Sequence, residues 1–202
     1  MAIKRKEKLL AAFCAVMVAI AAWWPLVLPR LGSGAASDPG GGELQYELSA
    51  DRTFYRVIGV KDDRVTEAVI PATYRDLPVR EIGEQAFYGC ADLARVAIPD
   101  GVTAIGASAF EGCSALASIA LPGSLTDIGE RAFKKCIALR ELTVPECVTS
   151  IGGDAFVFSG ITSVVLENTD LWHSRIGAVI TIDPTDPGAI AELLKNGYPL
   201  YR

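Results

Sequence analysis

IGASAFEGCSALASIALP, residues 105–122, is the stretch of sequence that decides the fold. Its residue types return at the same spacing 23 residues earlier and 23 residues later, and in part 46 residues later, with Ser159 in the place of the cysteine. The Ala-Phe pairs of the four copies are Ala86-Phe87, Ala109-Phe110, Ala132-Phe133 and Ala155-Phe156. A fixed period over this many positions predicts a repeat architecture in which each copy forms one coil.

Each copy divides into two halves with different patterns. The second half, such as Leu116 to Pro122, alternates apolar and polar residues, which predicts a short strand that proline ends. The first half returns the chain along the opposite wall, with glycine in a turn that a side chain would obstruct and alanine where the walls approach. Because no copy can close its own core, we expect the phenylalanines of successive coils to stack in one ladder.

The full pattern, Ile-Gly-x-x-Ala-Phe-x-x-Cys-x-x-Leu-x-x-Ile-x-Leu-Pro, resembles the BspA-like leucine-rich repeat surface protein family. The commoner leucine-rich repeat is a poorer match, because no Asn recurs here. The resemblance covers roughly residues 44–202 and implies an α/β-type repeat solenoid, with repeats over 79–166. Such a solenoid stacks short parallel strands joined by irregular convex segments, between an N-terminal β-hairpin cap and a C-terminal helix cap.

Both ends of the stack should be covered, because a terminal coil otherwise exposes its core. An N-terminal cap and an entry repeat are predicted over 43–78, where strand-like runs at 44–48 and 53–58 flank a turn and predict a hairpin. A decayed repeat and a helix are predicted over 167–202. Asp186 should cap this helix, which has proline at its first position and glycine past its end.

The N-terminal segment is strongly apolar. Leu9 to Pro29 contains 21 residues without a charge, and as a helix it would span roughly 31 Å, close to the roughly 30 Å hydrocarbon core of a bilayer. Four of the five residues 4–8 are basic, which favours a cytoplasmic position for that end. We therefore predict a signal anchor or transmembrane helix over 1–30, membrane contact through 9–29, and a C-terminal domain outside the cytoplasmic membrane.

A cleaved signal peptide is the alternative for this segment. Its apolar stretch usually has only about 7–15 residues, but the small residues at 33–36 offer a place where a peptidase could cut. Removal of residues 1–35 would make the protein secreted. The glycine-rich stretch 31–42 should be a flexible linker.

Charge is unevenly distributed along the chain. Fourteen of the 19 basic residues and 23 of the 24 acidic residues follow Arg30, which gives this part a formal charge of −9. An acidic body repels phosphate backbones, so nucleic acid is not expected as a partner.

No residue pattern points to catalysis or metal binding. His173 is the only histidine, and no Ser or Cys near it occupies a recognisable nucleophile setting. Cys90, Cys113 and Cys136 share one repeat position, so they should form a row of parallel, buried free thiols and neither a disulfide nor a tetrahedral metal site. Cys147, in a turn, should be exposed. The sequence predicts a non-enzymatic protein without cofactor or metal.

Proteins with leucine-rich repeats usually bind through the concave face of their strands, so the resemblance implies a ligand face here. The candidate ligand-binding residues are the side chains expected to point outward from successive strands. They are Glu67, Val69, Arg95, Ala97, Ser118, Ala120, Arg140, Glu141, Thr143, Ser163 and Val165. This face is small and lacks the aromatic side chains that dominate hot spots, so one copy should bind weakly. A solvated sheet face, with Glu67 and Arg95 as a simple cross-strand pair, is the alternative.

Together these features favour a membrane-anchored, extracytoplasmic protein that binds a protein or glycan on another cell, the matrix or the envelope. We expect the chain to be monomeric. A structural or assembly component of the cell envelope is the alternative function, and an accessory part of a hydrolase is a third.

Overall fold

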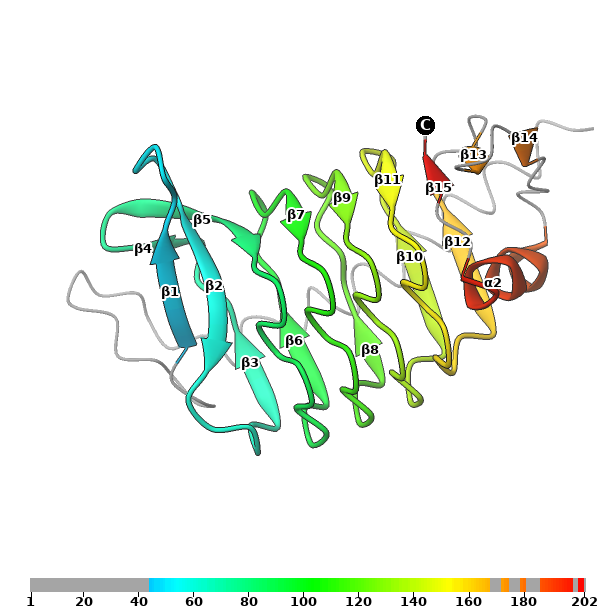
Figure 1. Cartoon of the computed structure of the whole chain (residues 1–202), viewed down its shortest axis with the longest axis horizontal. Coiled ribbons are helices and arrows are strands. Elements are labelled where there is room, and N and C mark those ends of the chain that lie inside the picture. Colours follow the sequence, from blue (N-terminus) through cyan, green and yellow to red (C-terminus); the bar gives the residue numbers. More distant parts are fainter. Residues whose placement is uncertain (1–43, 168–171, 175–178, 181–185, 198–199, 202) are drawn as a thin grey trace, which may run out of the picture. The chain divides into compact units, whose positions relative to one another are not determined.

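The repeats wind into five coils that build two walls, and each coil contributes one strand to the first wall (Figure 1). The computed structural model describes residues 44–167, 172–174, 179–180, 186–197 and 200–201, and these belong to one compact unit. The predicted anchor at 1–30 and the linker at 31–42 lie outside the described residues. Among those that are described, no helix is both long and apolar enough to cross a bilayer.

The first wall contains the strands that the Leu-x-x-Ile-x-Leu-Pro pattern predicts. They are β3 (Glu67–Val69), β6 (Arg95–Ala97), β8 (Ser118–Ile119), β10 (Glu141–Val144) and β12 (Ser163–Leu166). Adjacent strands are parallel, with β3, β6 and β8 in one sheet and β10 and β12 in another. Each strand buries an apolar side chain, and the residues on either side of it are exposed or half-buried. The buried side chains are Ala68, Val96, Ile119, Leu142 and Val164.

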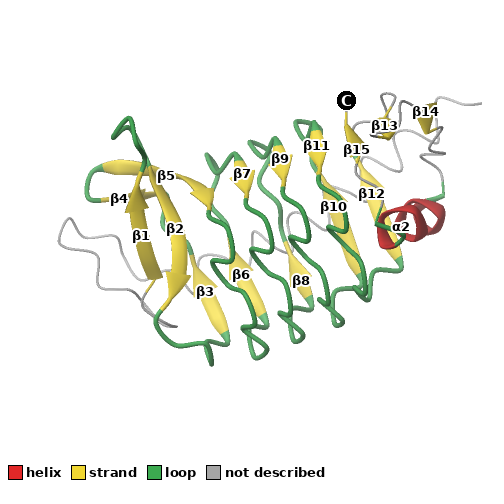
Figure 2. Cartoon of the chain, viewed as in Figure 1, coloured by secondary structure: helices red, strands yellow, loops and turns green. Residues whose placement is uncertain are grey.

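The second wall is also a hydrogen-bonded sheet (Figure 2). Its strands within the repeats are β5 (Leu77–Ile82), β7 (Ala104–Ile105), β9 (Asp127–Ile128) and β11 (Ser150–Ile151), all parallel. The expectation of irregular convex segments is therefore wrong for this wall. The term α/β-type is wrong as well, because residues 63–167 contain strands and turns but no helix. The repeats form a β-solenoid.

Backbone conformation explains why the return segments form no helix. In each of the four coils with an Ala-Phe pair, the residue directly before that pair has a left-handed φ between 52° and 58°. These residues are Gln85, Ser108, Arg131 and Asp154. A left-handed residue interrupts a right-handed helix, and it turns the local N–H groups toward the next coil. Ser108 N–H, for example, donates to Glu130 O at 2.8 Å, and Phe110 N–H donates to Ala132 O at 2.8 Å.

The core between the walls is a continuous stack of phenylalanine rings, as predicted. Phe87, Phe110, Phe133 and Phe156 are all 0% exposed. Successive ring centroids lie 5.1, 5.3 and 5.4 Å apart, with interplanar angles of 5°, 8° and 7°. Burying one such ring contributes about 1.5–3 kcal/mol, so the ladder is a principal source of stability.

The glycine that follows the buried isoleucine allows successive coils to approach closely. A Cβ on Gly106 would lie 2.6 Å from Glu84 N, and one on Gly129 would lie 2.6 Å from Ala107 N. Neither glycine has a positive φ. The role of these glycines is thus to make room for the backbone of the neighbouring coil. The sequence had suggested only that they allow a turn.

The N-terminal end carries the predicted hairpin. Strands β1 (Leu44–Leu48) and β2 (Tyr55–Val60) pair antiparallel, and β2 pairs parallel with β5. Strand β4 (Thr73–Tyr74) forms a second, short hairpin with β5. The hairpin thus extends the second wall beyond the first coil.

The predicted helix is α2 (Pro187–Lys195). Asp186 Oδ1 accepts hydrogen bonds from Gly188 N and Ala189 N at 3.1 and 3.0 Å, as a capping aspartate should. The helix buries Ile190, Ala191 and Leu194 and packs against β12. Of the C-terminal strands, β13 (Trp172–Ser174) pairs antiparallel with both β14 (Val179–Ile180) and β15 (Leu200–Tyr201). Strand β15 also pairs antiparallel with β11.

Candidate functional site

The predicted ligand-binding residues lie on the outer surface of the first wall, which we call the strand face. Nine of them belong to β3, β6, β8, β10 or β12, and Ala120 and Arg140 lie directly beside β8 and β10. The pairing aligns these residues in rows across the wall. Glu67, Arg95 and Ser118 are in register, Val69 is opposite Ala97, Glu141 is opposite Ser163, and Thr143 is opposite Val165.

The row arrangement follows from strand geometry. Successive side chains of a strand point to opposite faces, so the buried Ala68, Val96 and Ile119 point into the core while their neighbours face outward. Val69 and Val165 are 45% and 43% exposed, although both are apolar. The strand face therefore offers flat, partly apolar rows at its edges, and small side chains at Ala97, Ser118 and Ala120 toward its middle.

Charged groups on the strand face are few and partly satisfied by each other. Arg95 Nη2 and Glu67 Oε1 form an ion pair between β6 and β3, as the sequence suggested. Their side chains are 70% and 48% exposed, so this pair contributes little to stability. Arg140 is exposed, and its Nη1 donates to Gly160 O at 3.0 Å.

The row of cysteines is a packing feature. Cys113 Sγ donates to Phe87 O at 3.1 Å, and Cys136 Sγ donates to Phe110 O at 3.2 Å. Burial raises the pKa of the Cys136 thiol to about 12 and also raises that of Cys113. Cys90, Cys113 and Cys136 are buried free thiols and Cys147 is exposed, as predicted. A protonated, buried thiol is a poor nucleophile and a poor metal ligand.

No other grouping in the described part of the chain suggests metal chemistry. Among those residues, no three His, Cys, Asp or Glu side chains converge so as to hold an ion. The side chain of His173 lies outside the described set.

Two exposed apolar side chains were missed by sequence reasoning. Phe158 is 68% exposed and Ile137 is 57% exposed, both in turns between the walls. Their positions vary among the copies, so the repeat pattern does not distinguish them. The signal that was available is the replacement of a glycine, at 89 and 112, by phenylalanine at 158.

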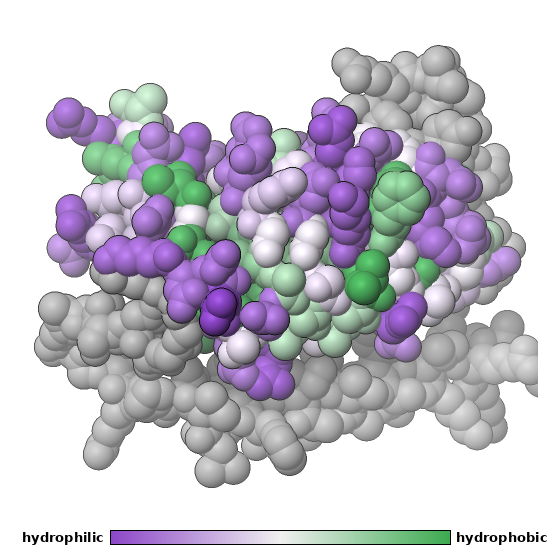
Figure 3. Space-filling model, turned by 60° about the horizontal axis from the view of Figure 1, so that its bottom comes forward, coloured by the Kyte–Doolittle hydropathy of each residue, from purple (hydrophilic) through white to green (hydrophobic). Residues whose placement is uncertain are grey.

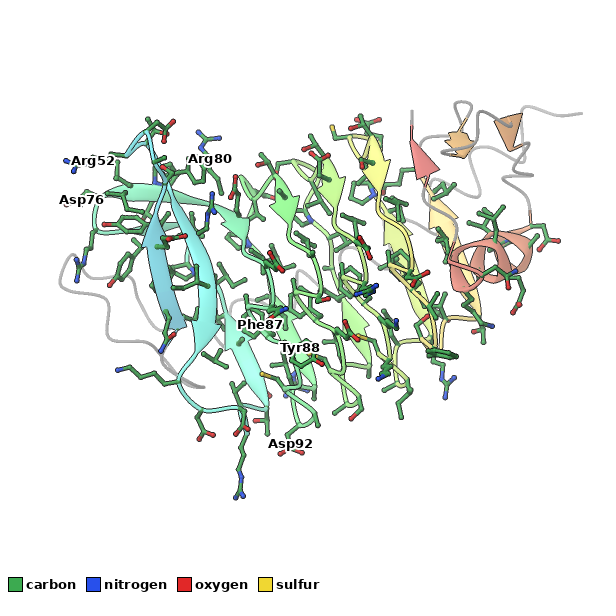
Figure 4. The ribbon with its side chains drawn as sticks, in the orientation of Figure 1. Arg52, Asp76, Arg80, Phe87, Tyr88 and Asp92 are labelled. Atoms are coloured by element: carbon green, nitrogen blue, oxygen red, sulfur yellow. The ribbon has the colours of Figure 1, made fainter. Side chains whose placement is uncertain are left out.

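Two aromatic residues away from the strand face, Tyr88 and Tyr74, differ in exposure. Tyr88 is 56% exposed, and Figure 4 shows it beside the buried Phe87, with Asp92 at the lower turn of the same coil. Tyr74 is half-buried, because its ring stacks on that of Tyr46 with centroids 4.0 Å apart. Tyr74 is therefore mainly a packing residue of the first coil.

Comparisons with known proteins agree on the repeat. The family model described as BspA type leucine-rich repeat region matches residues 63–173 in six copies. A solved leucine-rich repeat protein from Bacteroides capillosus is 32% identical, with a TM-score of 0.57 over 63% of this chain and 96% of that chain. One from T. pallidum is 31% identical, with a TM-score of 0.52 over 61% of this chain and 68% of that chain. No curated protein gives a significant match.

Proposed function

The chain belongs to the BspA-type leucine-rich repeat family, and from this we propose that it is a non-enzymatic binding protein that contacts a protein or glycan through the strand face. Members of this family are generally surface-exposed binding proteins. The observation that carries the proposal is the register of the first wall, which aligns the outward residues of adjacent strands in rows. A rigid row of side chains can bind a ligand without first paying the entropy of ordering itself.

Substitution on the strand face tests this proposal. We expect the full chain to bind immobilised matrix proteins or members of a glycan array, and we expect Arg95→Glu and Glu141→Ala to weaken that binding several-fold. Arg131→Glu is a matched control, because Arg131 also pairs with a glutamate, Glu130 at 3.2 Å, but lies in the turn that precedes Phe133. Binding that is indifferent to Arg95→Glu and Glu141→Ala would exclude the strand face.

We further propose that residues 9–29 anchor the protein in the cytoplasmic membrane with the repeats outside. The uncharged length of this segment and its basic flank support the proposal. Cys147 offers a direct test, because it is exposed whereas Cys90, Cys113 and Cys136 are buried. A membrane-impermeant maleimide added to intact cells should label the protein, and Cys147→Ser should abolish the labelling. Labelling that appears only after cell lysis would place the repeats inside.

A further inference from the structure

Phe158 occupies a position that neither folding nor core packing explains. Its side chain is 68% exposed, so it contributes little buried area. Its backbone is left-handed, with φ 59°, and the same repeat position holds glycine at 89 and 112 and Lys135, with φ 61°, in the coil between. A bulky residue is unfavourable in this conformation. An exposed aromatic side chain held in a strained backbone is a feature typical of contact surfaces.

The turn that carries Phe158 lies directly against the turn of the preceding coil. Val157 O accepts from Lys135 N at 3.0 Å, and Gly160 N donates to Cys136 O at 3.1 Å. A Cβ on Gly160 would lie 2.2 Å from Ile137 O, so the two backbones touch. Phe158 and the exposed Ile137 therefore belong to neighbouring turns of the solenoid. Figure 3 shows one face of the molecule, on which apolar residues lie among hydrophilic ones.

Two cations belong to the same pair of turns. Lys135 is exposed and forms no ion pair with any described residue. The adjacent Lys134 does form one, with its Nζ 3.9 Å from Asp154 Oδ2. Arg140 Nη1 donates to Gly160 O at 3.0 Å, which holds this exposed guanidinium beside the turn of Phe158. We call Lys135, Ile137, Arg140 and Phe158 the edge patch. It is basic and apolar, in a part of the chain whose formal charge is −9.

We propose that the edge patch binds an acidic polypeptide segment that places one large apolar side chain against Phe158 and Ile137. The carboxylates of this segment would pair with Lys135 and Arg140. An anionic lipid surface fits less well, because it would also face the acidic remainder of the protein. A short peptide meets only the local charges, since screening limits their reach to about 8 Å at physiological salt. This site goes beyond the strand face, which it adjoins at Arg140.

Binding of three labelled synthetic peptides to the full chain in zwitterionic nanodiscs tests the proposal. The first peptide is Asp-Glu-Leu-Phe-Glu-Asp, the second has lysine at all four acidic positions, and the third has serine in place of Leu-Phe. By fluorescence anisotropy, the first should bind more tightly than the other two. Phe158→Gly and Lys135→Glu should each weaken its binding about tenfold.

Control variants separate this site from folding defects and from the strand face. Phe158→Gly inserts a residue that two other coils carry at this position, so its melting temperature should stay within a few degrees of the wild type. Phe158→Asn, which also tolerates a left-handed φ, is the second variant if the first unfolds. Tyr88→Ala removes another exposed aromatic residue and Arg95→Glu alters the strand face, and both should leave peptide affinity unchanged.

Several outcomes would overturn the proposal. Equal affinity for the three peptides would exclude an acidic, apolar segment as the ligand. An affinity that Phe158→Gly leaves unchanged would exclude the edge patch as the binding site. Loss of binding with Arg95→Glu but not with Phe158→Gly would assign the peptide to the strand face. Phosphatidylglycerol vesicles that bind through Phe158, when the acidic peptide does not, would identify a lipid surface instead.

Discussion

At the residue scale, the same few positions decide the behaviour of every coil. The buried cysteine position is an example, because the thiols of Cys113 and Cys136 lie buried beside the phenylalanine ladder and donate to the backbone of the preceding coil. Cys113 reaches Phe87 O and Cys136 reaches Phe110 O, each 26 residues back. Ser159 stands at this position in the next coil, and its buried hydroxyl has no hydrogen-bond partner among the residues that the structure describes. The thiol satisfies this site better than the hydroxyl does.

The buried thiols predict a loss of stability at high pH. In the unfolded chain a thiol loses its proton near its ordinary pKa of 9.0, whereas burial raises the pKa of Cys136 to about 12. Its contribution is therefore complete below pH 9 and is lost as the pH rises toward 12. We expect the free energy of unfolding, measured with urea between pH 9 and 11, to decrease by up to about 1 kcal/mol per pH unit because of this thiol.

Two variants identify the groups that cause the loss of stability at high pH. Cys136→Ala should make the decline less steep, while alanine at the exposed Cys147 should leave it unchanged. If Cys136→Ala has the same pH profile as the wild type, other groups are responsible for the loss.

At the scale of the element, the second wall depends on glycine. Gly106 N donates to Ile82 O at 2.7 Å, and Gly129 N donates to Ile105 O at 2.8 Å. These hydrogen bonds join one coil to the next at the point where a Cβ would collide with the adjacent backbone. A short strand of two residues, such as β7 or β9, can persist because the neighbouring coils hold it from both sides.

Alanine substitution separates glycines that are needed for close approach from those that are not. Gly129→Ala would place Cβ 2.6 Å from Ala107 N, which requires a backbone shift, and should destabilise the fold by about 2–3 kcal/mol. Gly123→Ala is the matched control, because nothing lies within 4 Å of its Cβ position. Chemical denaturation of both variants measures the difference. Equal stabilities would show that the coils can separate at little cost.

At the scale of the whole molecule, each coil contacts its neighbours and stability accumulates along the stack. Phe110 stacks on Phe87 on one side and on Phe133 on the other. The loss of one ring should therefore weaken three coils together. This coupling is also what keeps the rows of the strand face in register.

Truncation of a central ring tests the coupling. Phe110→Ala should lower the free energy of unfolding by about 3–5 kcal/mol, because the ring is fully buried and the walls cannot collapse into the cavity. Tyr88→Ala, at an exposed position in the adjacent coil, should change stability by less than about 1 kcal/mol. Calorimetry or urea unfolding should resolve the two. An unchanged transition for Phe110→Ala would contradict the stacked core.

The sequence by itself determined the coil period, the phenylalanine ladder, the buried thiols and the outward residues of the first wall. The period, the ladder and the thiols follow from residue types that recur every 23 positions. The outward residues follow from the alternation of side-chain direction along a strand. The helix cap at Asp186 was equally local, since it depends on residues 186–189 alone.

Only the tertiary structure decided the second wall, the reason for its glycines and the edge patch. Those features depend on which atoms of the neighbouring coil, 20 or more residues away, lie within contact distance. Phe158 and Ile137 lie outside the repeating pattern, so only the stacking of their turns brings them to one edge. The periodic sequence therefore specifies the features that the coils share. The environment of a single side chain such as Phe158 depends on contacts between coils, which the period does not contain.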